Sequence, residues 1–133
     1  MKQIIFFLAL FIGTCSFSQD TTKARPCNQL PIAGAEKKAT FDGKTEKFFS
    51  QNLPNELKKG THSAVFKLLV DCYGLPSKPM YQSGSLTESN QKYFLDLLLT
   101  TKWKPAVDKF ADVTTFVFIT LEIVNGQVTV VVQ

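Results

Sequence analysis

The 133-residue sequence contains little of the chemistry on which most catalytic and metal sites depend. It has one histidine, His62, and three cysteines, none of which forms a Cys-x-x-Cys pair. A metal site needs more ligands than this, and a general base needs an oriented partner. The sequence also lacks a Gly-x-Ser-x-Gly motif and a glycine-rich phosphate-binding loop. We therefore predict a non-enzymatic protein that has no cofactor and no metal.

An excess of charge of one sign is also absent. The chain has 15 Lys and Arg residues against 11 Asp and Glu residues, which gives a net charge of +4. Adjacent basic residues come as short pairs, Lys37-Lys38 and Lys58-Lys59. A nucleic-acid-binding face is usually denser in basic residues, with aromatic residues between them. We expect these pairs to lie on solvated surfaces, and we expect no nucleic-acid partner.

Residues 1–19 have the organisation of a secretory signal peptide. Lys2 precedes an apolar run over residues 4–12, and small and polar residues then lead to Gln19. The run is shorter than the ~20 apolar residues that span a bilayer. We expect cleavage near Gln19 and export to the periplasm or to the outside of the cell. Two alternatives stay open: an uncleaved membrane anchor, and a lipid anchor on Cys15 after cleavage before that residue.

Removal of the signal peptide leaves two cysteines, Cys27 and Cys72. An even number of cysteines in an exported chain permits a disulfide. Such a bridge would close a loop of about 45 residues, to which the chain-entropy model assigns roughly 4 kcal/mol of stabilisation. The spacing is equally compatible with two free thiols. The Cys27–Cys72 bridge is therefore an expectation that the spacing by itself does not decide.

The exported part divides into an irregular leader at residues 20–40 and a folded domain at residues 41–133. The leader is polar, contains Pro26 and Pro31, and shows no hydrophobic period. No internal repeat is visible in either part. We therefore expect a single domain preceded by a lightly tethered arm.

The first half of the domain predicts a helix and two strands. A short helix is expected within residues 40–53, with Asp42 as the residue that caps its start. Residues 63–71 alternate in the manner of a strand. The Asp-x-x-Gly sequence at residues 71–74 is typical of a type I turn. Residues 75–82 contain two prolines, which cannot donate to a ladder, so this strand is expected to be short or at an edge.

The second half of the domain predicts the clearest helix and a long hairpin. Ser85 and Glu88 match a capping box, and the apolar pattern after them predicts a helix to about Lys102. Residues 113–124 are rich in β-branched and aromatic residues, as strands are. Two turn residues, Asn125-Gly126, then favour a hairpin, and residues 128–132 provide the returning strand.

Four pieces of sequence stand in a characteristic order along the domain. They are Leu53-Pro54 with Leu57 and Gly60, residues 66–74, Trp103-Lys104-Pro105-Ala106, and the strand that begins at Val113. The order of helix, strand, Asp-x-x-Gly turn, strand, helix, Trp-x-Pro-Ala and strand resembles the C-terminal domain of the TonB family. The resemblance extends over roughly residues 41–124.

This resemblance implies an α+β fold in which a small antiparallel sheet packs on two helices. Family members act in the envelope of double-membraned bacteria, where an edge strand pairs with a short segment of an outer-membrane transporter. Trp103, Pro105 and Ala106 match the family motif. We expect Trp103 to pack the end of the helix against the sheet rather than to bind a partner.

We therefore predict an exported binding module that recognises an envelope protein or peptide, such as an outer-membrane transporter, by edge-strand pairing. The candidate edge is the last strand, at Val128, Val130 and Val132, or the proline-bearing strand at residues 75–82.

Transducing family members have a long proline-rich spacer, which residues 20–40 are too short to supply. The alternative is a membrane-anchored energy transducer that keeps its N-terminal segment. A small secreted enzyme or inhibitor is a further alternative, and a homodimer is also considered because family domains can exchange strands.

Overall fold

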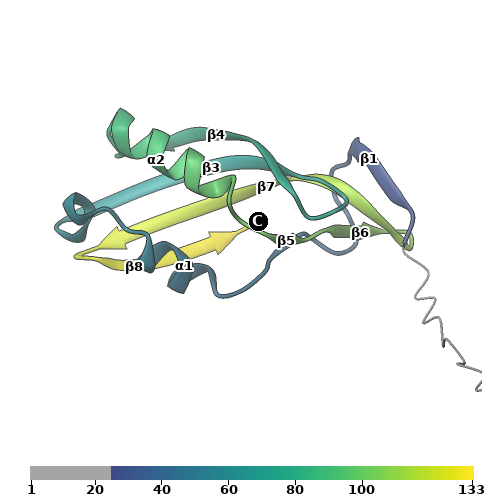
Figure 1. Cartoon of the computed structure of the whole chain (residues 1–133), viewed down its shortest axis with the longest axis horizontal. Helices are drawn as coiled ribbons and strands as arrows, with labels where there is room; N and C mark the ends of the chain where they lie inside the picture. Colours follow the sequence, from purple (N-terminus) through teal and green to yellow (C-terminus); the bar gives the residue numbers. More distant parts are fainter. Residues whose placement is uncertain (1–24) are drawn as a thin grey trace, which may run out of the picture.

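The computed structural model describes residues 25–133, and their fold is mixed α+β. The predicted signal peptide, its cleavage near Gln19 and the alternative lipid anchor on Cys15 lie outside the described residues. A curved sheet of six strands forms the body of the fold (Figure 1). Two α-helices accompany the sheet, and both lie in front of it in the view of Figure 1.

The long strand β7 (Ala111–Val124) is the centre of the sheet. It pairs antiparallel with β3 (Thr61–Val70) on one side and, over its second half, with β8 (Gln127–Val132) on the other. Strand β4 (Pro76–Gly84) pairs with the far side of β3. The antiparallel part of the sheet therefore has the order β8-β7-β3-β4, with β8 and β4 at its edges.

Four shorter strands complete the β structure. Near its start, β7 pairs with β6 (Ala106–Asp108) in antiparallel fashion and with β1 (Cys27–Pro31) in parallel fashion. Strands β2 (Thr40–Phe41) and β5 (Trp103–Lys104) form a separate antiparallel pair.

The prediction of an irregular leader over residues 20–40 is wrong for Cys27–Pro31, which form β1. Besides β1, Ile32 donates its N–H to Thr114 O at 3.0 Å, and Lys37 exchanges two backbone hydrogen bonds with Val107, each at 2.9 Å. All of these partners lie far along the chain. Because short strands paired to distant residues need no hydrophobic period of their own, the local sequence did not reveal them.

Helix α1 (Thr45–Gln51) begins later than Asp42, its predicted cap. Asp42 instead donates its backbone N–H to Lys102 O at 2.9 Å, which continues the pairing of β2 with β5. The residue that precedes the helix, Lys44, makes no capping hydrogen bond through its side chain. The prediction of Asp42 as the cap is wrong because the chain stays extended beside β5 until it has passed that residue. A 3₁₀ helix, η1 (Asn55–Lys58), follows α1.

Helix α2 (Glu88–Leu98) is capped by Thr87, whose hydroxyl accepts the N–H of Asn90. The predicted capping box at Ser85 is wrong, because the Ser85 hydroxyl accepts the N–H of Ser63 on β3 at 3.0 Å instead. The helix also ends before Lys102. The two threonines that follow it donate their hydroxyl groups to its last carbonyls, at 2.7 and 2.5 Å, and so terminate it.

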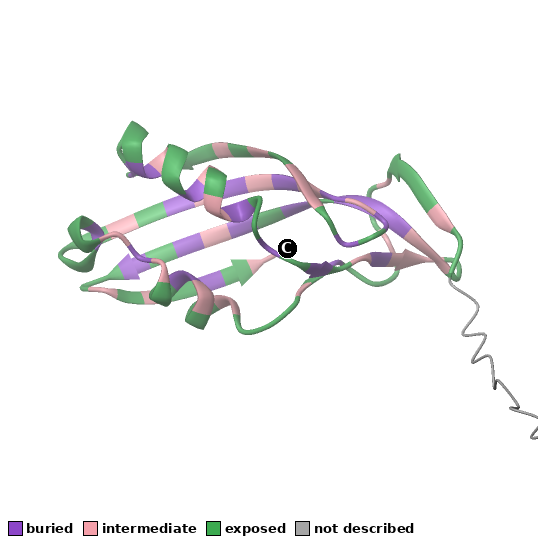
Figure 2. Ribbon diagram, viewed as in Figure 1, coloured by how far each residue is buried: buried purple, intermediate pink, exposed green. Residues whose placement is uncertain are grey.

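The hydrophobic core lies against one face of the sheet. Alternate residues of β3 and β7 are buried, and Figure 2 shows this alternation along both strands. Three elements each contribute a phenylalanine that is at most 1% exposed: Phe49 from α1, Phe66 from β3 and Phe94 from α2. Full burial of such a side chain contributes roughly 1.5–3 kcal/mol. The core therefore lies between the helices and the β3–β7 pair.

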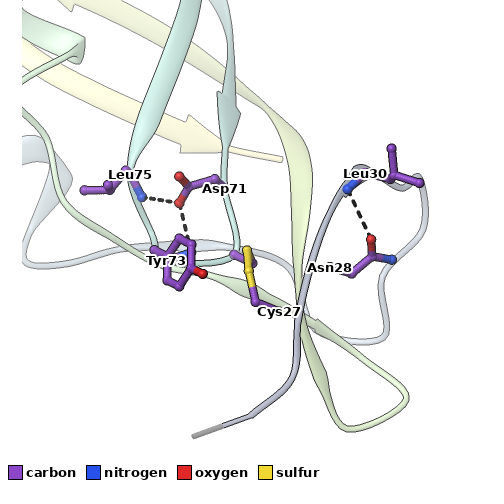
Figure 3. The surroundings of a disulfide bond; sticks show 7 residues. Cys27, Asn28, Leu30, Asp71, Tyr73 and Leu75 are labelled. Atoms are coloured by element: carbon purple, nitrogen blue, oxygen red, sulfur yellow. Dashed lines mark hydrogen bonds between the residues drawn. A yellow bond between two sulfur atoms is a disulfide. The ribbon is translucent and has the colours of Figure 1, made fainter.

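The turn between β3 and β4 has the predicted Asp-x-x-Gly hydrogen bond, from Gly74 N–H to Asp71 O at 2.9 Å. The Asp71 carboxylate also accepts the N–H groups of Tyr73 and Leu75, at 2.8 and 2.9 Å (Figure 3). Gly74 has a φ of +80°, and its carbonyl accepts the N–H of Trp103 at 3.1 Å. A Cβ on Gly74 would collide with the Trp103 carbonyl. This turn therefore fixes β5 against the end of β3.

Replacing Gly74 with alanine is expected to lower the free energy of unfolding by about 2 kcal/mol or more, because the positive φ and the collision act together. Gly34→Ala is the matched control, since Gly34 has a φ of +73° but nothing lies within 4 Å of its Cβ position. Urea titration of both variants measures the difference. Equal losses in the two variants would show that the contact with Trp103 contributes nothing.

Candidate functional site

The described residues do not gather the side chains that a metal site would need. Within residues 25–133, no group of three or more His, Cys, Asp or Glu residues could hold a metal ion. The ring Nε2 of His62 lies 2.8 Å from the carbonyl oxygen of Lys59, in the loop just before β3. In the same described range, none of the helices combines the length and the apolar character that crossing a bilayer requires.

Strand β4 is one edge of the sheet, as its prolines predicted, but it is poorly suited to accept another strand. Pro76 and Pro79 lack the N–H groups that an incoming strand would bond. The register between β3 and β4 shifts at two places, and Lys78 has a φ of +50°, outside the extended region. Prolines and irregular register are features by which natural proteins protect an edge.

Strand β8 is the other edge and has none of these protections. Its sequence, Gln127–Val132, contains no proline and no charged residue. Its register with β7 is unbroken along its whole length. An uncharged, regular edge of this kind is a template for pairing with another strand.

The hydrogen bonds of the ladder decide which backbone groups of β8 face outward. Gln133 and Phe118 exchange two backbone hydrogen bonds, each at 2.9 Å. In an antiparallel ladder, residue pairs of this kind alternate with pairs that exchange no bond. Counting back along the unbroken register places Val128, Val130 and Val132 in the non-bonded pairs. Their N–H and C=O groups therefore point to the open edge, and the described residues supply no backbone partner for them.

The side chains of the same three valines face the core. Val130 is buried, and Val128 and Val132 are half-buried against the core cluster, where α1 packs beside β8. A partner would therefore meet these residues through their backbone. The side chains beside such a partner would be those of Thr129 and Val131 on the opposite face, where Val131 is 48% exposed.

The sequence analysis did not single out Lys67, Phe116 and Phe118, which share the face of the sheet that lies away from the core. Lys67 on β3 is the register partner of Phe118 on β7. Its Nζ lies 4.1 Å from the centre of the Phe116 ring and 5.6 Å from that of Phe118. The alternation along residues 113–124 was the signal that could have found them, because it separates the two aromatic residues from the buried positions between them.

The structure joins Cys27 and Cys72 in a disulfide, with their Cα atoms 5.4 Å apart (Figure 3). Cys27 lies at the start of β1, and Cys72 is buried in the turn after β3. The bridge therefore attaches β1 to the turn between β3 and β4, which is also the turn that contacts β5.

The residues of the Trp-x-Pro-Ala motif lie inside the fold. Trp103 is 5% exposed and packs edge-on against Phe41, with the ring centres 5.4 Å apart. Its Nε1–H donates to the hydroxyl of Thr101 at 2.8 Å. Ala106 is fully buried and Pro105 is half-buried. The motif therefore packs the segment after α2 against β2.

No protein-family model matches this chain, and neither the curated proteins nor the solved structures include a significantly similar one.

Proposed function

We propose that this chain is an exported, non-enzymatic binding module that recognises an extended segment of an envelope protein or peptide by adding it as a strand to β8. The observation that carries the proposal is the row of outward N–H and C=O groups at Val128, Val130 and Val132. Strand addition takes its affinity from main-chain hydrogen bonds and its specificity from alternate side chains. The exposed Val131 favours a partner with apolar residues at the adjacent positions.

Two further features support the envelope as the place of action. The signal-peptide pattern of residues 1–19 indicates export, and disulfides such as Cys27–Cys72 persist in oxidising compartments.

A TonB C-terminal-like assignment of the fold is part of the proposal. It is supported by the mixed α+β architecture, the two α-helices and the ordered sequence pieces that end in Trp-x-Pro-Ala. An outer-membrane transporter is the partner that this assignment suggests.

Strand addition to β8 is tested with the double variant V128P/V132P, which removes two outward N–H groups and no hydrogen bond to β7. We expect it to bind the partner at least roughly fivefold more weakly, because each of the two lost hydrogen bonds contributes about 0.5–1.5 kcal/mol. The matched control, V128A/V132A, truncates the same side chains but keeps both N–H groups, and it should bind as the wild type does. Each protein is immobilised and exposed to envelope extract, and the captured proteins are identified by mass spectrometry.

A synthetic peptide from the captured segment is then titrated calorimetrically against all three proteins. Amide hydrogen exchange at Val128, Val130 and Val132 should slow when the peptide is bound. Equal affinity for the proline and alanine variants would place binding elsewhere, and the absence of any captured envelope protein or peptide would contradict the proposed function.

A further inference from the structure

A pocket of about 420 Å³ lies between the segment that follows β1 and the first half of β7, next to the end of β8. Its lining includes Ile32 and Ala35 from that segment and Phe116, Val117 and Phe118 from β7. Pockets of this size with mostly apolar walls and a few polar groups are typical of small-ligand sites. Phe116 and Phe118 are 46% and 39% exposed, so their rings are accessible to a ligand.

Two basic side chains border this pocket. Lys38 and Lys67 both line it, and no Asp or Glu does. Among residues 25–133, neither lysine forms an ion pair. The Lys67 ammonium is instead held over the Phe116 ring, at 4.1 Å from its centre. A cation kept above aromatic surface and left without a counter-ion favours a ligand that carries an anionic group.

Within residues 25–133, the backbone on the β7 side of the pocket has unbonded groups at one residue only, Phe116, which is too short a stretch to pair with a strand. Thr114 O accepts the N–H of Ile32, and both backbone groups of Phe118 are bonded to Gln133. Alternate residues of a strand direct their backbone groups to the same edge, so those of Phe116 face the gap between these two contacts. Among the described residues they have no partner. Because the gap is one residue long, it suits a small ligand better than an extended peptide.

We propose that this pocket binds a single-chain alkyl carboxylate of medium chain length. The acyl chain packs along the exposed rings of Phe116 and Phe118, and the carboxylate pairs with the Lys67 ammonium beside them. The Phe116 N–H is a further donor at the same wall. This site is separate from the outward edge of β8, so it stands or falls independently of strand addition.

The probe is sodium decanoate, titrated by calorimetry and by amide chemical shifts into protein purified after export. We expect one molecule to bind, with the largest shifts at residues 32–35 and 116–118. Lys67→Gln should weaken binding on the order of tenfold, because a hydrogen bond to a charged group is lost. Lys92→Gln, at an exposed position on α2, is the matched control and should leave the affinity unchanged. A melting curve verifies that both variants are folded.

Two further compounds separate the parts of the ligand. Decyltrimethylammonium has the same chain length with the opposite charge, and it should bind more weakly than decanoate. Acetate has the carboxylate without the chain, and it should not bind measurably. The proposal is overturned if the cationic and anionic compounds bind equally, if Lys67→Gln retains full affinity, or if the shifts occur outside the pocket.

Discussion

Replacing Phe94 with alanine is expected to lower the free energy of unfolding by about 3–5 kcal/mol. Phe94 is completely buried, and its ring centre lies 6.2 Å from that of Phe49 and 5.9 Å from that of Phe66. It therefore joins α2 to α1 and to β3. Truncation removes the apolar area of the ring, leaves a cavity, and breaks aromatic contacts with two other elements.

The measurement is a denaturant titration at constant temperature. Leu99→Ala is the control, because it also shortens a large apolar side chain at the end of α2, but Leu99 is 49% exposed. It should cost less than about 0.5 kcal/mol. Because domains of this size have about 5–15 kcal/mol of stability, the Phe94 variant loses a large part of the total. Similar losses for Phe94→Ala and Leu99→Ala would show that the three-element junction is not the centre of the core.

Reduction of the Cys27–Cys72 disulfide is expected to lower the free energy of unfolding by about 2–4 kcal/mol. The two cysteines are 45 residues apart, so the cross-link removes much conformational freedom from the unfolded chain. Apart from the disulfide, the segment around β1 is attached to β7 by few backbone hydrogen bonds. Among them are Asp112 N–H to Pro26 O at 2.9 Å and Ile32 N–H to Thr114 O at 3.0 Å.

The experiment compares the oxidised and reduced forms of a chain that begins at Asp20, from which Cys15 is absent. The double variant C27A/C72A is the control, and reductant should leave its unfolding midpoint unchanged. Amide exchange at Ile32 and Asp112 should speed up more on reduction than exchange within β3, because the arm opens first. Identical unfolding midpoints with and without the disulfide would contradict the prediction.

The parts of the fold that the sequence predicted well are those with local signals. The strand expected at residues 113–124 is β7, and the strand expected at residues 63–71 is β3, because alternation along a strand is visible within a few residues. Asn125 and Gly126 have φ values of +50° and +84°, as the hairpin between β7 and β8 requires. Turn chemistry of this kind belongs to the residues themselves.

The wrong predictions concern residues whose neighbouring sequence favours one role, but which in the structure form hydrogen bonds to a distant part of the chain. Asp42 and Ser85 are both good capping residues, yet Asp42 donates its N–H to Lys102 and the Ser85 hydroxyl accepts the N–H of Ser63. Residues 27–31 have no strand period, yet they pair with β7. In each case a hydrogen bond to a remote part of the chain replaced the local alternative.

The sequence by itself determined that this chain has two cysteines after a signal-like segment, a long strand and a hairpin that ends in a valine-rich strand. Only the tertiary structure decided which face and which edge of that strand are exposed. The reason is that register is a relation between strands: the pairing of Gln133 with Phe118 turns the backbone of Val128, Val130 and Val132 outward and their side chains inward. The same holds for the pocket, because Ile32 and Phe116 become neighbours only when β1 has docked beside β7.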